Sequence, residues 1–251
     1  MIRKDKIYFI SDIHLGLPDP EGGREKEKLV VKWLDEIKKD ATELFLVGDI
    51  FDFWFEYKHV VPKGNTRFLG KIAEIADSGI PVHYFTGNHD IWVFDYLPGE
   101  LGIRLYRDEQ VFERSGKKIF VAHGDGLGPG DRSYKMLKKI FTGKFNQFMF
   151  RNLLHPDWGM AFGKRWSVKS RYGQKKKRGF LGEEEWLVQY SRRILNEQDI
   201  DFFVYGHRHR AAEFPLNEKC TFYNLGEWIY TMSYLVFEDG KCELKYYKQD
   251  S

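Results

Sequence analysis

The stretch Glu43-Leu-Phe-Leu-Val-Gly-Asp-Ile-Phe-Asp52 decides how this chain folds. Four apolar residues in a row are typical of a strand that is buried on both faces. The run ends at Gly48, and the carboxylates of Asp49 and Asp52 follow. We therefore expect a buried strand at Glu43–Val47 that ends in a tight turn with acidic side chains. Open α/β sheets place their functional sites at this carboxyl end of their strands.

The same arrangement occurs four more times along the chain. A β-branched or aromatic run leads into a short polar turn that carries Asp, Asn or His. These segments are Asp12-Ile13-His14, Gly87-Asn88-His89-Asp90, His123-Gly124-Asp125 and Gly206-His207-Arg208-His209. By itself each is a common turn with a high false-positive risk. Because all five fall at strand ends, together they predict one composite site.

Hydrophobic periodicity predicts alternating strands and helices around these turns. The expected strands are Lys6–Ile10, Glu43–Val47, Val82–Thr86, Lys118–Ala122 and Phe202–Tyr205, and the expected helices are Glu25–Lys38, Thr66–Ser78 and Glu183–Glu197. Three strands that we expect to be antiparallel finish the chain, at Thr221–Asn224, Met232–Glu238 and Glu243–Tyr247. The β-α-β-α-β order of the first half favours a central, largely parallel sheet. We predict one domain over residues 1–251 with a mostly helical insertion at about 131–182.

Composition limits the classes of protein to consider. Hydrophobic content of 42% and charged content of 31% are typical of a soluble globular chain. Cys220 and Cys242 form neither a disulfide framework nor a metal-ligand spacing, which favours a reducing compartment. We see no signal-peptide pattern and no uncharged apolar run of the ~18 residues that a spanning helix needs. We expect neither secretion nor a membrane span, and attachment to a surface stays open.

The polar turns carry the donor types that divalent cations prefer. Asp12 and His14 are two residues apart, so in an extended segment both can face one ion, and His207 and His209 repeat this spacing. The carboxylate of Asp49 has two oxygens and could bridge two ions. Mixed nitrogen and oxygen ligation without thiolate suits Mn, Fe, Co, Ni or Zn. Two such ions ~3.5–4 Å apart suit the hydrolysis of a phosphate ester or anhydride.

As an ordered set, these motifs resemble those of the calcineurin-like metallophosphoesterases. The resemblance covers almost the whole chain and implies an α/β fold, a four-layer α/β/β/α sandwich with a helical insertion. It implies two metal ions. The first would be held by Asp12, His14 and His209 and the second by Asn88, His123 and His207, with Asp49 as the bridge.

The resemblance also implies roles for residues beside the ions. His89 would not bind metal but would stabilise the transition state or protonate the leaving oxygen. Asp52 would orient His89, although it could instead cap a helix. Asp90 and Asp125 are expected to bind backbone or groups around the ligands rather than metal.

The insertion is both basic and aromatic. Fourteen Lys and Arg residues but one acid, Asp157, lie between Arg132 and Gly182. Aromatic and apolar residues fill its first part, from Tyr134 to Trp166, and a second aromatic group follows Asp49 and Asp90. Apolar residues beside a cationic run suit a phosphorylated lipid at a membrane surface. Alternatively the aromatics form the insertion's own core and the basic run is a solvated loop.

Within the family, the chain is most similar to the UDP-2,3-diacylglucosamine pyrophosphatases of lipid A synthesis. The similarity rests on residues 10–16, 48–54, 123–127 and 224–228 and on the insertion. It implies hydrolysis at the α-phosphate to UMP and 2,3-diacylglucosamine 1-phosphate, with Mn²⁺, at the cytosolic face of the inner membrane. Asp131, Ser167 and Arg171 would contact substrate. The best-known members carry Arg in place of His89, so this chain departs from them there.

Two other functions remain open. The basic insertion could hold a nucleic-acid backbone, which would make the protein a phosphodiesterase or nuclease with strongly salt-dependent binding. A non-catalytic scaffold of the same fold is a third reading, but every expected ligand position is filled. We expect a lipid-nucleotide substrate rather than nucleic acid, and the sequence indicates no protein partner.

Overall fold

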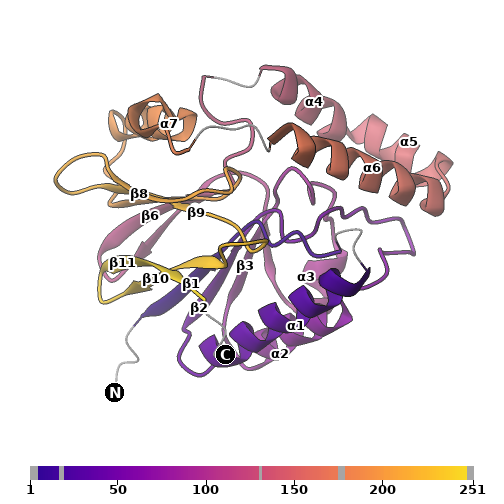
Figure 1. Cartoon of the computed structure of the whole chain (residues 1–251), viewed down its shortest axis with the longest axis horizontal. Coiled ribbons are helices and arrows are strands. Elements are labelled where there is room, and N and C mark those ends of the chain that lie inside the picture. Colours follow the sequence, from indigo (N-terminus) through magenta and orange to yellow (C-terminus); the bar gives the residue numbers. More distant parts are fainter. Residues whose placement is uncertain (1–4, 17–19, 130–131, 175–178, 248–251) are drawn as a thin grey trace.

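The computed structural model describes residues 5–16, 20–129, 132–174 and 179–247. Two mixed sheets pack face to face (Figure 1). The first has the order β11 (Lys241–Tyr246), β10 (Ser233–Glu238), β1 (Lys6–Ile10), β2 (Glu43–Val47), β3 (Val82–Phe85) and β4 (Arg104–Tyr106). The second has the order β5 (Gln110–Arg114), β6 (Lys117–Ala122), β7 (Phe202–Tyr205), β9 (Thr221–Leu225) and β8 (Ala211–Pro215). Strands β1 to β4 are parallel, as are β6, β7 and β9.

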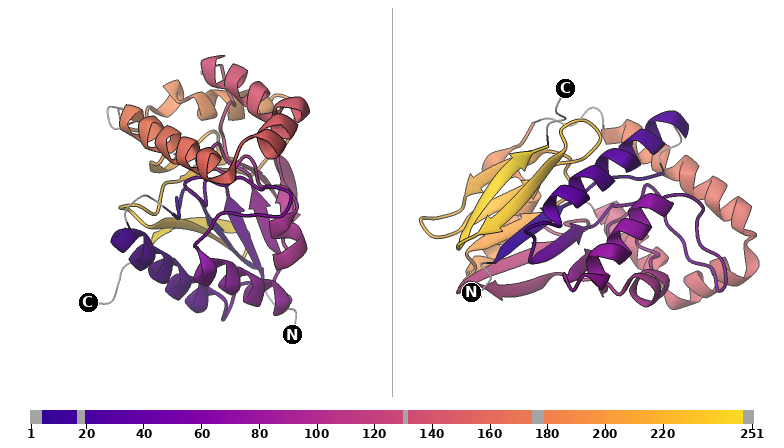
Figure 2. Two further views of the ribbon diagram at one scale, coloured as in Figure 1. Left: turned by 90° about the vertical axis from the view of Figure 1, so that its right-hand side faces the viewer. Right: turned by 90° about the horizontal axis from the view of Figure 1, so that it is seen from below.

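Helices cover the outer face of each sheet, which gives four layers (Figure 2). The helices α1 (Pro20–Ile37), α2 (Thr66–Asp77) and α3 (Tyr96–Leu101) cover the first sheet. The 3-10 turn η1 (Gly182–Glu184) leads into α7 (Trp186–Leu195), which covers the second. The insertion helices α4 (Arg132–Thr142), α5 (Lys144–Leu153) and α6 (Pro156–Gln174) lie across one end of the sandwich.

Side-chain alternation in the central strands explains this layering. In β1, Ile7 and Phe9 point into the core between the sheets, whereas Tyr8 and Ile10 point into the core under α1 and α2. Successive side chains of a strand face opposite sides, so a strand with apolar residues at every position can fill two cores. The α/β class and the four-layer sandwich are thereby confirmed.

The β-α-β-α-β order of the first half forms parallel strands as expected, within one of the two sheets. One expectation about the strands was wrong: the first of the three closing strands is not antiparallel throughout, because β9 pairs in parallel with β7 in the second sheet. The chain leaves β7, forms β8, and returns as β9 in the direction of β7. Short elements, namely α3, β4, β5 and β8, were not anticipated, because strands such as Ala-Ala-Glu-Phe-Pro carry a weak pattern and end in proline.

Candidate metal centre

The two sheets bring the polar segments together at the carboxyl ends of five strands. Asp12 and His14 follow β1, Asp49 and Asp52 follow β2, Asn88 and His89 follow β3, His123 follows β6, and His207 and His209 follow β7. Parallel neighbours end at the same edge of a sheet, so residues far apart in sequence become neighbours in space.

One group of four side chains converges on a point between β1, β2 and β7. Ligand atoms of Asp12, His14, Asp49 and His209 all lie within 4.8 Å of one another. The Nε2 of His209 lies 3.0 Å from Oδ1 of Asp12 and 3.2 Å from Nε2 of His14. Two imidazoles and two carboxylates therefore share one small volume.

A second group lies beside the first and shares Asp49 with it. Ligand atoms of Asp49, His123 and His207 also lie within 4.8 Å of one another. The Nε2 of His123 is 3.4 Å from Oδ2 of Asp49. Asn88 adjoins this group, because its Oδ1 lies 2.9 Å from Nδ1 of His207. All seven residues that the sequence indicated as ligands are thus brought together.

Two buried atoms of these groups have the character of metal donors. The Nδ1 of His123 lies 2.9 Å from the carbonyl oxygen of Val47, which can only accept, so Nδ1 carries a proton and Nε2 is the nitrogen that could bind a cation after losing its own proton. That Nε2 and the Oδ1 of Asp12 are buried and have no partner in good hydrogen-bond geometry within the described residues, although this Oδ1 lies 3.0 Å from Nε2 of His209. Because unsatisfied buried polar atoms are costly, a cation bound here would satisfy them. The mixed nitrogen and oxygen donor set fits two divalent ions.

In the metal-free site, the pKa values of the histidines shift in two opposite directions. Burial lowers the pKa of His14 to about 4 and that of His207 to about 3, so both are neutral at pH 7. For His123 burial also lowers the pKa, but Asp49 more than reverses this and raises it to about 10. Burial would raise the pKa of Asp49, yet His123 and His89 hold it well below its ordinary value. The carboxylate is therefore ionised and ready to bind a cation.

The backbone at the ligands is unusual. Asp12, His14, Asp49, His207 and His209 have positive φ angles of 52°, 51°, 52°, 68° and 51°. Residues other than glycine rarely adopt this left-handed region, at a cost of order 1 kcal/mol each. Asp and His tolerate it better than most, and the surrounding strands hold the turns in place. The sandwich thus positions five of the seven candidate ligands through strained turns.

Motif glycines are required by close approach to the ligands. A Cβ on Gly48, whose φ is +80°, would collide with the ring of His123. A Cβ on Gly87 would collide with the carboxylate of Asp49. Only a residue without a side chain lets these turns pass behind the ligands.

His89 lies beside the candidate ligands in an orientation fixed by the main chain. Its Nδ1 is 2.8 Å from the carbonyl oxygen of Asp52, so Nδ1 donates and Nε2 is left for other groups. The resemblance implied that the Asp52 carboxylate would orient His89, and in the structure the Asp52 carbonyl accepts from its Nδ1. The Asp52 carboxylate lies 3.6 Å from Nδ1 of His14 and within 4.8 Å of a ring nitrogen of His89.

Asp90 and Asp125 bind groups around the ligands. Asp90 accepts hydrogen bonds from the main-chain N–H of Gly87 (2.7 Å) and Ile50 (2.8 Å) and from the Tyr84 hydroxyl (2.6 Å). It therefore ties the turn after β3 to the turn after β2.

Asp125 ties the insertion to the candidate metal site in the same way that Asp90 ties two turns together. It accepts from Tyr134 at 2.6 Å and pairs with Lys138 at 2.7 Å. Both partners belong to α4, so this carboxylate joins the insertion to the turn that carries His123.

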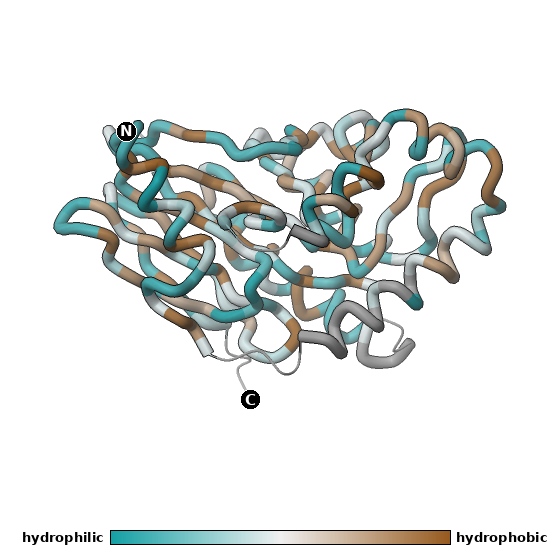
Figure 3. The backbone as a smooth tube through the Cα atoms, turned by 90° about the horizontal axis from the view of Figure 1, so that it is seen from above, coloured by the Kyte–Doolittle hydropathy of each residue, from teal (hydrophilic) through white to brown (hydrophobic). Residues whose placement is uncertain are grey.

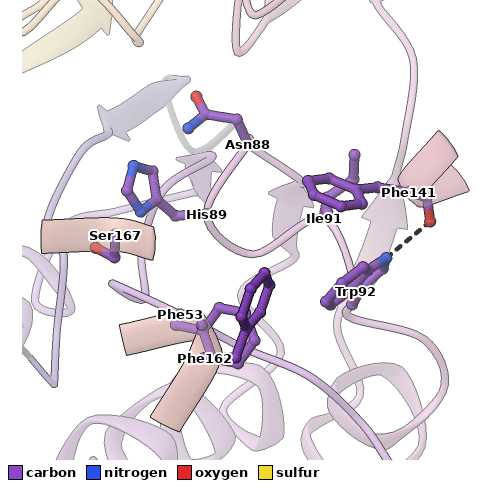
Figure 4. Close-up of a pocket in the computed structure, with 9 residues that line it drawn as sticks. Phe53, Asn88, His89, Ile91, Trp92, Phe141, Phe162 and Ser167 are labelled. Atoms are coloured by element: carbon purple, nitrogen blue, oxygen red, sulfur yellow. Dashed lines mark hydrogen bonds between the residues drawn. The ribbon is translucent and has the colours of Figure 1, made fainter. Parts of the chain in front are cut away.

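A narrow pocket of about 40 Å³ opens beside His89 and Asn88 (Figure 4). Apolar groups from the loops and the insertion line the rest of it, including Phe53, Ile91, Trp92, Phe141 and Phe162. Ser167, an expected substrate contact, is buried and also lines this pocket. Asp131 and the side chain of Arg171, the other two expected contacts, lie outside the described residues.

The sequence left two roles open for the aromatic residues, core packing and an apolar binding surface. In the loops after β2 and β3 they serve both. Phe55, Tyr57, Ile91 and Trp92 are buried together, and Phe141 and Phe150 of the insertion pack on them. The indole N–H of Trp92 donates to the carbonyl of Phe141 at 2.8 Å. Most of these rings therefore hold the insertion in place, while Phe53 and Trp92 also face the pocket.

Sequence reasoning missed two residues that support the ligands. The hydroxyl of Ser11 donates to the carboxylate of Asp12, and the side-chain amide of Asn224 donates to the carbonyl of Gly206 at 2.6 Å. Asn224 lies at the carboxyl end of β9, where position alone could have found it.

A family model described as Calcineurin-like phosphoesterase matches residues 5–211. The chain belongs to the calcineurin-like phosphoesterases and, with the Asp and His clusters above, is a metal-dependent hydrolase. It is 36% identical to the UDP-2,3-diacylglucosamine hydrolase of Porphyromonas gingivalis, over 94% of this chain and 95% of that protein. It is 28% identical to the enzyme of the same name from Neisseria meningitidis, over 81% of this chain and 82% of that protein. Among solved structures, a dimetal phosphatase from Danio rerio covers 97% of this chain and 96% of its own, at 13% identity and a TM-score of 0.49.

Proposed function

We propose that this protein hydrolyses UDP-2,3-diacylglucosamine to UMP and 2,3-diacylglucosamine 1-phosphate. The oxygen of water attacks the α-phosphorus, and the bond from that phosphorus to the bridging oxygen breaks. The observation that carries the proposal is the apolar pocket that opens directly beside His89 and Asn88. A lipid-linked pyrophosphate needs this combination of a hydrolytic centre and an apolar wall. The relatives of the same name support the choice of substrate.

In this proposal the seven residues at the strand ends are the ligands of two divalent cations. Asp12, His14 and His209 would hold one ion, and Asn88, His123 and His207 would hold the other. Asp49 would bind both, which agrees with its place in both groups. Two such ions, Mn²⁺ by our proposal, would supply Lewis acidity toward water and the phosphate oxygens.

His89 is the proposed proton donor of the reaction. Its Nδ1–H is held by the carbonyl of Asp52, so a protonated ring presents Nε2–H to the substrate. A donor there would stabilise charge on the phosphate or protonate the departing oxygen. Asp52 supports the reaction through that carbonyl and through its carboxylate beside His14.

Ser167, Asp131 and Arg171 remain the proposed substrate contacts. Ser167 is supported by its position in the pocket, across from His89. Because the pocket is narrow, acyl chains would extend from it along the insertion. Phe162 both lines the pocket and is 51% exposed, so it joins the pocket to the surface of the insertion.

The exposed residues of the insertion helices further support contact with a membrane surface, and by our proposal this surface is the cytosolic face of the inner membrane. Large apolar residues stay exposed on them: Met136, Ile140, Phe145, Phe148, Met149, Leu153, Trp158 and Phe162. Hydrophobic segments recur along these helices in Figure 3. Exposed apolar groups of this extent mark interaction sites. Within the described residues, no helix is long and apolar enough to cross a membrane.

The test is an assay of UMP release from UDP-2,3-diacylglucosamine in neutral detergent with Mn²⁺. A deacylated UDP-glucosamine substrate is the matched comparison. We expect release of UMP from the acylated substrate and a much lower kcat/KM without acyl chains. Cleavage of DNA or a cyclic nucleotide by a chain that leaves the lipid substrate intact would favour the nuclease reading instead.

A further inference from the structure

A second pocket, of about 720 Å³, lies between α5 and the loops that follow β2, β3 and β4. It shares no lining residue with the pocket beside His89. Four cationic side chains line it, those of Lys58, Arg107, Lys144 and Arg151, against one carboxylate, that of Asp95. A concave surface with this imbalance concentrates anions.

The two arginines of this cationic pocket are held in place and form no ion pair within 4.0 Å among the described residues, although Glu56 and Asp108 lie near enough to Arg107 to stabilise its charge. Both guanidinium carbons lie over the ring of Phe94, at 5.5 Å for Arg107 and 5.7 Å for Arg151. Their hydrogen bonds go to main-chain carbonyls, from Arg107 to Val93 at 2.6 Å and from Arg151 to Tyr57 at 3.4 Å. The Nε of Arg151 is buried and makes no hydrogen bond among the described residues. Oriented guanidinium donors of this kind suit a phosphate group.

The outer wall of the pocket indicates which phosphate compound would bind. Phe148 lines the pocket and is 60% exposed, and the same helix exposes Phe145 by 72% and Leu153 by 70%. No residue of α5 is buried. A soluble phosphate ion has no apolar group that could contact this rim, whereas a phospholipid carries acyl chains close to its phosphate.

We propose that the cationic pocket is a second binding site, which takes the phosphate headgroup of an anionic phospholipid. This site would favour binding to membranes that contain anionic lipids, whereas the substrate would bind and react at the metal centre. The inference rests on the membrane contact proposed above but not on the identity of the substrate.

The test is sedimentation of the full chain with vesicles of phosphatidylcholine alone or of phosphatidylcholine doped with phosphatidylglycerol. The pocket variant is Lys58→Glu with Lys144→Glu, since both lysines are exposed and belong to no proposed catalytic group. The control, Lys32→Glu with Lys219→Glu, makes the same charge change at exposed positions outside the pocket. We expect binding to doped vesicles to weaken at least about tenfold for the pocket variant and by no more than about twofold for the control. Equal losses in the two variants would overturn the site in favour of general charge attraction.

Two further measurements test whether the pocket binds free phosphate and whether the pocket variant keeps its hydrolytic activity. Inorganic phosphate, compared with chloride at the same ionic strength, should not release the wild-type chain; specific release would assign the pocket to free phosphate. Release of UMP from detergent-solubilised substrate should be unchanged in the pocket variant. Because vesicle binding requires no turnover, a chain that binds doped vesicles through these lysines but releases no UMP would sink the proposed substrate and leave this inference standing.

Discussion

The Nε2 atoms of His14 and His209 lie 3.2 Å apart, although 195 positions separate the two residues in the sequence. One follows a strand of the first sheet and the other a strand of the second. Their common neighbour is the carboxylate of Asp12. The first candidate metal position therefore exists only while the two sheets stay packed together.

Replacement of His209 by Ala should remove one metal ion and leave the other. His209 belongs to the group around Asp12, whereas His123 and His207 belong to the other group. Metal analysis after gel filtration should give about one ion per chain instead of two. The exposed His155 provides the control, since His155→Ala should keep both ions. Loss of both ions, or of none, would contradict the assignment.

Replacement of His89 by Ala should keep both ions but lower kcat by about 10²–10⁴-fold, because it removes a proton donor and no ligand. The measurement combines metal analysis with UMP release. His59→Ala, at an exposed position, should change neither quantity. If His89→Ala loses metal, His89 is a ligand and the proposed mechanism is wrong.

Gly87→Ala should impair metal binding and turnover strongly, because its Cβ would collide with the carboxylate of Asp49. Gly70→Ala is the matched control: Gly70 lies within α2, and a Cβ there meets nothing within 4 Å. Alanine is the better helix former, so this control should raise the free energy of unfolding by about 0.5–1 kcal/mol without affecting turnover. Equal activity of the two variants would show that the turn after β3 can move away.

Metal affinity should rise with pH. In the metal-free site Asp49 raises the pKa of His123 to about 10, after the opposing effect of burial. A cation needs the neutral ring, so binding below that pH must release a proton. We expect the dissociation constant to fall about tenfold per pH unit and per proton released near neutrality. Calorimetry in buffers of different ionisation enthalpy counts the protons, and binding without proton release would contradict the prediction.

Glu43 should stabilise the fold in a pH-dependent way. Burial would raise its pKa, but His83 and Arg114 lower it to about 2. A lowered carboxyl pKa contributes stability above its ordinary value of 4.5 that is lost as the pH falls toward 2. Glu43→Gln should therefore cost about 1–2 kcal/mol at pH 7, allowing for partial exposure, and the difference should shrink by about half near pH 3.

Urea unfolding across this range measures the effect, with Glu74→Gln as the comparison. Glu74 has a similar pKa of about 2, but its partners Lys38 and Lys71 form a surface network in which it is itself exposed. Solvent screens such pairs, so its loss should matter far less. Equal effects at both positions would show that burial of Glu43 is irrelevant.

Much of this architecture could be predicted because strand patterns and turn motifs coincide. Apolar runs such as Glu43–Val47 specify strands buried on both faces, and the polar turns after them specify where the sheet edge lies. The pairing of β9 with β7 could not be predicted, since strand neighbours across a crossover depend on tertiary packing. The role of the Asp52 carbonyl was also out of reach, because main-chain groups carry no sequence signal.

Left-handed turns at five of the seven proposed ligands restrict how this chain can evolve. A bulky or β-branched replacement at Asp49 would lose a metal donor and also strain the backbone, whereas Gly or Asn would keep the turn. Relaxed selection on metal binding would thus still favour small residues at these positions. A descendant that no longer binds metal would keep the outline of the centre in its main chain long after the donors themselves had gone.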